Sequence, residues 1–133
     1  TSAGGLNIAE WTLSENNIDL MILCLGANDM LRGINPKETK NNLEEIIKIA
    51  KNKNIKVIIA GMIAPTSYGF AYKKSFDKIF SDLSKKHKLQ LIPFLLEGVA
   101  QNPKFNLSDG MHPNDQGTII IGNTLKKAIL ENL

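Results

Sequence analysis

The stretch IDLMILCLG, residues 18–26, is an almost unbroken apolar run that ends in a glycine. Such a run is typical of a strand in a parallel sheet, because helices cover both faces of the sheet and neither face needs polar side chains. Further runs occur at residues 56–62 and, in a shorter form that ends at Pro93, at residues 89–92. We therefore predict three buried parallel strands, the first over residues 18–25.

Helical patterns alternate with these strands. Asn35 can cap a helix whose first residue is Pro36, and Glu38 occupies the position of a capping-box acid. Further helices are expected over residues 72–87, from about Asp115 to the end of the chain, and over residues 5–16. Each helix has a predicted inward face. The inward residues are Leu43, Ile46, Ile47 and Ala50 in the helix that begins at Pro36, and Phe76, Ile79, Phe80 and Leu83 in the helix over residues 72–87. They are Ile121, Leu125, Ala128 and Ile129 in the last helix, and Leu6, Ala9 and Leu13 in the first, where Trp11 lies near the edge.

The alternation of strands and helices predicts a three-layer α/β domain with a parallel sheet. The length of 133 residues fits a single domain over residues 1–133. Three strands make a narrow sheet for this architecture, and a buried strand expects a neighbour on each side. The pattern therefore indicates an incomplete sheet.

Composition excludes several classes of function. The chain is 43% hydrophobic and 22% charged, as in globular proteins. Its net charge is only +3, with scattered lysines, which argues against a nucleic-acid partner. No apolar run reaches the ~18 residues of a membrane span. The single cysteine, Cys24, excludes an internal disulfide and a cysteine-based zinc site, and we expect it to be a buried, unreactive thiol.

Polar residues follow the first predicted strand in the segment GANDMLRG, residues 26–33. Ligands of open α/β sheets bind beyond the carboxyl ends of the strands, where this segment lies. The side-chain amide of Asn28 can donate hydrogen bonds to an oxyanion. Alternatively, Asn28 and Asp29 only cap the turn.

A second polar segment, LSDGMHPND at residues 107–115, precedes the last helix. Asp109 can bind one ring nitrogen of His112 and leave the other free as a base. Alternatively, Asp109 shapes the turn and His112 is exposed and idle. A metal site would need the distant His87, which makes a poor ligand set. We expect His87, flanked by lysines at a helix end, to be solvated.

Together, GANDMLRG and the segment DGMHPN resemble motifs of the SGNH (GDSL-type) hydrolases. The resemblance is closest to the thioesterase I-like branch of bacterial arylesterases and lysophospholipases. It covers essentially the whole chain, including TSAGGL near the start, NPKET at the helix entry, the PTSYG loop and the segment LIPFLLEGVA. It implies a three-layer α/β/α fold with a flavodoxin-like parallel sheet.

The resemblance also implies roles for individual residues. Asn28 would donate to the oxyanion, His112 would be the general base, and Asp109 would orient it. Residues 63–69 and 94–99 would border the acyl or alcohol pocket.

The family's nucleophilic serine lies in a Gly-Asp-Ser block, and no such block occurs in this sequence. By the same resemblance, a glycine that donates to the oxyanion would precede Thr1, and two strands of the sheet would be missing. We therefore interpret the chain as an N-terminally truncated domain that holds the acid–base arm of a serine hydrolase. The serines present are poor substitutes: Ser2 and Ser67 are expected near strand ends, Ser14, Ser75, Ser81 and Ser84 on helices, and Ser108 as a hydrogen-bonding loop residue.

The leading hypothesis is an ester or thioester hydrolase that acts through an acyl-enzyme and needs no metal or organic cofactor. Its partners would be a small acyl ester or thioester and, for this chain, the missing segment as a separate chain. The family resemblance alone implies that the protein is periplasmic or secreted. The alternatives are a remnant without nucleophile that serves as a binding or assembly module, and a flavodoxin-like binding domain in which these residues occur by chance.

Overall fold

Three parallel strands in the order β1-β2-β3 form the sheet: β1 (Leu20–Leu23), β2 (Lys56–Ala60) and β3 (Gln90–Ile92). The computed structural model describes residues 1–133, which form two units, Thr1–Pro93 and Phe94–Leu133. The sheet belongs to the first unit. Its strands confirm the three predicted runs but are shorter, because the apolar runs extend past the residues that pair with a neighbouring strand. The ladder itself continues to Asp19, whose carbonyl accepts the Lys56 N–H at 3.0 Å.

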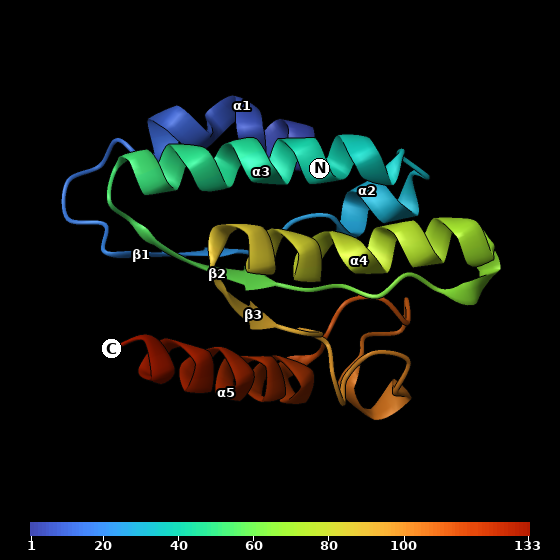
Figure 1. The fold of residues 1–133 in the computed structure, drawn as a ribbon. Helices are drawn as coiled ribbons and strands as arrows, with labels where there is room; N and C mark the ends of the chain where they lie inside the picture. Colours follow the sequence, from blue (N-terminus) through green and yellow to red (C-terminus); the bar gives the residue numbers. More distant parts are fainter. The chain divides into compact units, whose positions relative to one another are not determined.

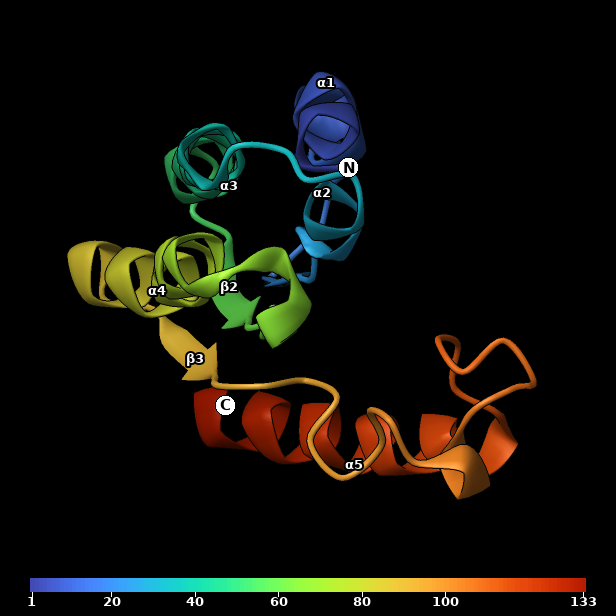
Figure 2. The ribbon, with the colours of Figure 1, turned by 90° about the vertical axis from the view of Figure 1, so that its right-hand side faces the viewer.

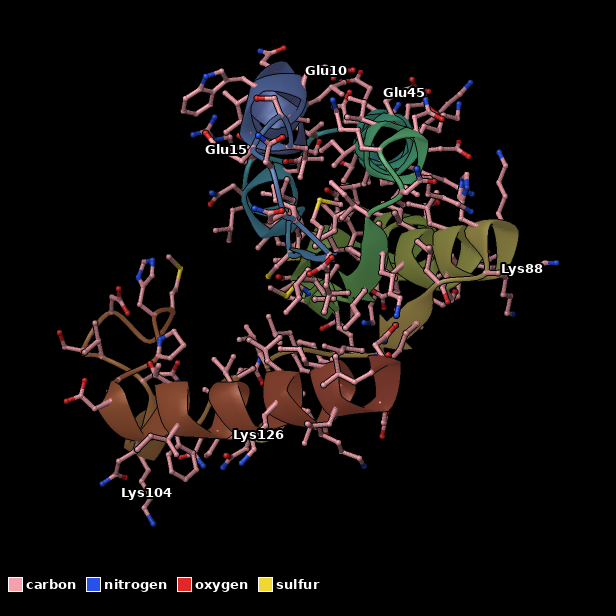
Figure 3. The ribbon with its side chains drawn as sticks, turned by 90° about the vertical axis from the view of Figure 1, so that its left-hand side faces the viewer. Glu10, Glu15, Glu45, Lys88, Lys104 and Lys126 are labelled. Carbon is pink, nitrogen blue, oxygen red and sulfur yellow. The ribbon has the colours of Figure 1, made fainter.

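Helices of the first unit pack on the sheet and on one another (Figure 1). These helices are α1 (Ser2–Thr12), α2 (Ala27–Leu31), α3 (Pro36–Asn52), the short 3-10 helix η1 (Thr66–Tyr68) and α4 (Phe70–His87). Helices α3 and α4 contact each other and β2, and α1 contacts α3. Figure 3 shows Glu10 of α1 and Glu45 of α3 pointing away from the strands.

The predicted N-cap Asn35 and the predicted first residue Pro36 of α3 are confirmed. Asn35 is the N-cap and its side-chain oxygen accepts the Lys37 N–H at 3.0 Å, while Pro36 is the first helical residue. Glu38 lies in the first turn, where its negative charge suits the helix dipole. The sequence therefore fixes the start of α3 to the residue.

The predicted inward faces of the first unit form its core. The four predicted residues of α3 and the four of α4 are all buried. On β2, Val57 and Ile59 join this core, and the intervening Ile58 points to the opposite face of the sheet. Ala9 of α1 and Leu13, which follows the helix, are buried, and Leu6 is half-buried against the core. Trp11 is 76% exposed, so it lies on the outer surface rather than at an edge.

The bounds of α1 differ from the prediction of residues 5–16. Thr1 caps the helix, with its hydroxyl accepting the Gly4 N–H at 3.1 Å, so the helix begins at Ser2. It ends at Thr12, and Ser14, which we placed on a helix, lies in the turn that follows. Helix α4 begins at Phe70, directly after Gly69.

The second unit consists of turns, the 3-10 helix η2 (Pro103–Phe105) and helix α5 (Asp115–Asn132), as seen in Figure 2. The side-chain oxygen of Asn114 caps α5 by accepting the Gly117 N–H at 3.0 Å. A Cβ on Gly117 would collide with the Phe105 carbonyl oxygen, so α5 packs closely on η2. The predicted inward face of α5 is confirmed in part: Ala128 is buried, and three residues are half-buried, Ile121, Leu125 and Ile129.

None of the helices combines the length and the apolar character that crossing a bilayer requires.

Candidate active site

The loop before α5 brings Asp109 and His112 together. Oxygen Oδ2 of Asp109 lies 2.5 Å from Nδ1 of His112. The other carboxylate oxygen, Oδ1, accepts the backbone N–H groups of Met111 at 2.9 Å and His112 at 3.0 Å. The Asp109 carboxylate therefore holds both the ring and the backbone of its partner.

These contacts favour the ionised form of Asp109. The backbone N–H of His112, its side chain and the backbone N–H of Met111 together lower the pKa of Asp109 from 3.8 to about 2. Asp109 is thus an anion at neutral pH. An anion at Nδ1 fixes the proton on that nitrogen and leaves the lone pair on Nε2.

The backbone around this pair is closed by its own hydrogen bonds. The Leu107 N–H donates to the His112 carbonyl at 2.8 Å, and Asn106 forms an antiparallel bridge with Pro113. Gly110 has a φ of 70°, which the turn between Asp109 and His112 requires and which glycine adopts without strain. A loop fixed in this way presents the His112 ring outward, with 69% of the side chain exposed.

A shallow pocket adjoins the loop on the second unit. Its volume is about 330 Å³, and Asn102, Asn106, Leu107, Ser108 and Gly110 are among its lining residues. Within the unit, Asn106 is held by hydrogen bonds from its amide to the carbonyls of Val99 and Asn102. The bonds from the Asn106 side chain to these two backbone carbonyls therefore hold this wall of the pocket in place.

Asn28 lies in the first unit, just beyond the carboxyl end of β1. It is the second residue of α2, a helix of five residues that the sequence did not indicate, and its side chain is exposed. Gly26 precedes the helix with a φ of 121°, a backbone conformation that glycine adopts without strain. The Asn28 amide is therefore available to a ligand.

Asp29, next to Asn28, is only 1% exposed. Its Oδ1 accepts the Ser2 N–H at 2.7 Å, and its Oδ2 accepts the Ser2 hydroxyl and, at 2.9 Å, the Thr39 hydroxyl. Sequence reasoning offered Asp29 only as a cap of the turn and missed this cluster. No local signal marks it, because Ser2 and Thr39 lie 27 and 10 residues away.

The loop after β2, predicted to border a substrate pocket, is held by α4. The Ala64 N–H donates to Asp77 at 2.8 Å, and the Lys73 ammonium donates to the Ala64 carbonyl at 2.8 Å and to Asp77 at 2.7 Å. Residues 94–99, the other predicted border, form a run of turns. Their roles in binding stay predictions.

The serines take several positions. Ser2 is fully buried and bound to Asp29, whereas Ser67 lies in η1 and Ser108 in the exposed loop beside Asp109. The predicted helical positions of Ser75, Ser81 and Ser84 on α4 are confirmed. Ser2 has no path to a substrate because its side chain is sealed from solvent.

Two expectations were wrong. His87 is not solvated: its side chain is 13% exposed and its Nε2 lies 2.7 Å from Glu44 Oε1, because the end of α4 packs against α3. Cys24 is exposed rather than buried, because it follows β1, an outer strand whose only partner is β2. No three His, Cys, Asp or Glu side chains gather as a metal site requires.

The sequence of the chain is similar to the sequences of known hydrolases. Residues 2–118 match the GDSL-like lipase/acylhydrolase family. The chain is 32% identical to an arylesterase of Vibrio mimicus over 133 residues, which is all of this chain and 66% of the relative. It is 30% identical to thioesterase 1/protease 1/lysophospholipase L1 of Escherichia coli K12 over 129 residues, 97% of this chain and 62% of the relative.

Among solved structures, the crystal structure of TesA superimposes with a TM-score of 0.85 at 33% identity, covering 96% of this chain and 73% of that one. This likeness confirms the predicted fold class, a three-layer α/β/α fold with a parallel sheet. The chain spans about two thirds or less of the length of the two curated relatives. It belongs to the GDSL-like lipase/acylhydrolase family, the SGNH hydrolases.

Proposed function

We propose that this chain is part of a serine hydrolase that cleaves carboxylic esters or thioesters through an acyl-enzyme. The observation that carries the proposal is the Asp109–His112 pair, with 2.5 Å between Oδ2 and Nδ1 and the far side of the ring exposed. A histidine held in this way has the geometry of a general base for a serine hydroxyl.

Three residues of this chain take part in the proposed reaction. His112 removes the proton of the serine as it attacks the acyl carbonyl, and then returns it to the leaving alcohol or thiol. Asp109 fixes the tautomer of the ring and stabilises the imidazolium that forms. Asn28 donates from its side-chain amide to the oxyanion of the tetrahedral intermediate.

We further propose that the nucleophilic serine lies outside these 133 residues, which would form one domain with the missing segment. The absence of a Gly-Asp-Ser block supports this, as does the burial of Ser2. The missing segment, whether joined to this chain or separate, would be its essential partner.

The substrate class follows from the relatives. Two of them are an arylesterase and a thioesterase 1/protease 1/lysophospholipase L1. A small acyl ester or thioester is therefore the proposed substrate. The attack of a serine hydroxyl on an ester carbonyl requires no metal or organic cofactor.

A fluorophosphonate, which phosphonylates activated serines, tests the proposal directly. The 133-residue chain alone should show no labelling and no ester turnover. The intact protein should show both, with the adduct on a serine outside these residues, and His112→Ala should abolish both. An adduct on Ser2, Ser67 or Ser108, or hydrolysis by the 133-residue chain alone, would overturn the assignment of the nucleophile.

A further inference from the structure

A buried carboxylate lies directly beside the proposed oxyanion donor. Asp29 accepts three hydrogen bonds, two from Ser2 of α1 and one from Thr39 of α3. The amide of Asn42, also on α3, donates to the Ser2 hydroxyl oxygen at 3.0 Å. We call these four residues, Ser2, Asp29, Thr39 and Asn42, the Asp29 cluster. It joins three helices through one carboxylate.

Helix α2 depends on such an anchor. Five residues are far too few for a helix to be stable by itself, since the first turn must be ordered before any hydrogen bond forms. Backbone bonds close its two ends: the Met30 N–H donates to the Gly26 carbonyl, the Arg32 N–H to the Asn28 carbonyl, and the Ile34 N–H to the Asp29 carbonyl. Through hydrogen bonds, the side chain of Asp29 ties α2 to α1 and α3.

The same helix carries Asn28 on its exposed side. Because Asn28 and Asp29 are adjacent, the rotation of α2 that buries Asp29 also sets the direction in which Asn28 points. An oxyanion donor must lie within about 0.5 Å of its productive position, and displacement by about 1 Å can cost a hundredfold in rate. A fixed α2 is therefore a requirement for the proposed chemistry.

We propose that Asp29 is a positioning residue of the active site, which acts through Asn28 by holding α2 against Ser2 and Thr39. This inference rests on the proposed role of Asn28 as oxyanion donor. Asp29 itself touches no substrate, because its side chain is sealed from solvent.

The charge state of Asp29 agrees with this role. Burial works against the ionised form, but the hydrogen bonds from Ser2 and Thr39 outweigh it and lower the pKa of Asp29 below 3.8. An ionised carboxylate accepts from all three donors at once, whereas an amide has only one accepting oxygen. Asp29→Asn therefore loses at least one bond without a change in size.

Thr39 gives the sharper test because it lies outside α2. In the intact protein, Thr39→Val removes the hydroxyl at nearly constant volume and should lower kcat on a p-nitrophenyl ester by about tenfold, with KM within twofold. Thr39→Ser keeps the hydroxyl and should restore kcat. Ile47→Val, a buried change on the same helix that leaves the cluster intact, is the control and should leave kcat unchanged.

A double-mutant cycle separates positioning from general damage. If Thr39 and Asp29 act through Asn28, Thr39→Val should have no further effect on kcat when Asn28 is already alanine. A full tenfold loss in the Asn28→Ala background would overturn the inference. So would equal losses of kcat in Thr39→Val and Ile47→Val.

A readout without catalysis distinguishes this inference from the proposed function. Amide hydrogen exchange of Met30 and Ile34 in the intact protein should be faster in Thr39→Val and in Asp29→Asn but not in Ile47→Val. If the wild type hydrolyses no ester, the proposed function fails while the exchange still tests the anchor. Unchanged exchange in both cluster variants would show that Asp29 does not hold α2.

Discussion

Two carboxylates of this chain are bonded alike but placed differently. Asp29 and Asp109 each accept three hydrogen bonds, and in both the pKa is lowered. Asp29 is 1% exposed and its partners are hydroxyl and backbone groups. Asp109 has 43% of its side chain exposed, and one of its partners is an imidazole that reaches into solvent.

The difference in exposure indicates different roles: Asp29 stabilises the packing of helices, and Asp109 orients a catalytic side chain. A buried carboxylate whose donors cannot leave stabilises one arrangement of helices, and its loss should appear as instability and misplacement. An exposed carboxylate gains little stability from its contacts, because water competes for them. What it provides is the orientation and charge of its partner, so its loss should appear in the rate.

The largest effect is expected at Asp109. In the intact protein, Asp109→Asn should lower kcat about a thousandfold or more, since the amide neither holds the correct tautomer nor stabilises the imidazolium. Steady-state kinetics on an aryl ester provides the measurement, with Asp115→Asn as a control on a nearby exposed carboxylate. Turnover within twofold of wild type would remove Asp109 from the mechanism.

Asn28, the neighbour of the buried carboxylate, is expected to show the next largest effect. Asn28→Ala should lower kcat about a hundredfold to a thousandfold with a smaller change in KM, because the bond strengthens only as negative charge develops; this corresponds to about 2.7–4 kcal/mol. Asn41→Ala on α3, also exposed, is the matched control. An effect confined to KM would assign Asn28 to substrate binding instead.

Stability should reverse the ranking of the two carboxylates. Asp29→Asn should lower the free energy of unfolding by about 3 kcal/mol, because buried donors lose a charged acceptor. Asp109→Asn should leave it almost unchanged, because water competes for the contacts of an exposed carboxylate. Urea unfolding of the intact protein measures both changes. Equal losses of unfolding free energy in the two variants would contradict the proposed difference in role between Asp29 and Asp109.

The smallest expected effect is on titration. The Asp109 carboxyl carbon, followed by NMR, should titrate with a pKa of about 2, against an ordinary 3.8. Because the folded pKa is the lower one, these contacts stabilise the fold above pH 3.8 and lose that contribution as pH falls through about 2. In His112→Ala the pKa should rise only part of the way to 3.8, since both backbone N–H donors remain. A full return to 3.8 would show that the imidazole alone causes the shift.

The sequence predicted what local patterns encode. The periodicity of Leu43, Ile46 and Ile47 and the Asn35-Pro36 signal placed α3, and the apolar runs placed all three strands. The short spacing between Asp109 and His112 made their contact predictable, because a three-residue turn returns one side chain to the other.

Contacts between distant segments left no such signal. No residue near Asp29 in the sequence indicates that Ser2 and Thr39 donate to it. The local sequence therefore predicts only that Asp29 caps a turn. His87 is paired with Glu44, 43 residues away, through packing of two helices. Helix α2 has five residues, too few to show a helical period in the sequence. The exposure of Cys24 depends on whether β1 is an outer strand of the sheet, which the local sequence does not show.

That outer edge of β1 has a consequence for handling the 133-residue chain. The backbone N–H and C=O groups on the side of Leu20–Leu23 away from β2 have no strand partner in this sheet, and an apolar open edge invites pairing with another chain. The opposite edge, β3, is only three residues long and is followed by Pro93, which limits such pairing. Cys24, exposed directly after β1, is the only cysteine, so its rate of alkylation reports whether that edge is open or occupied.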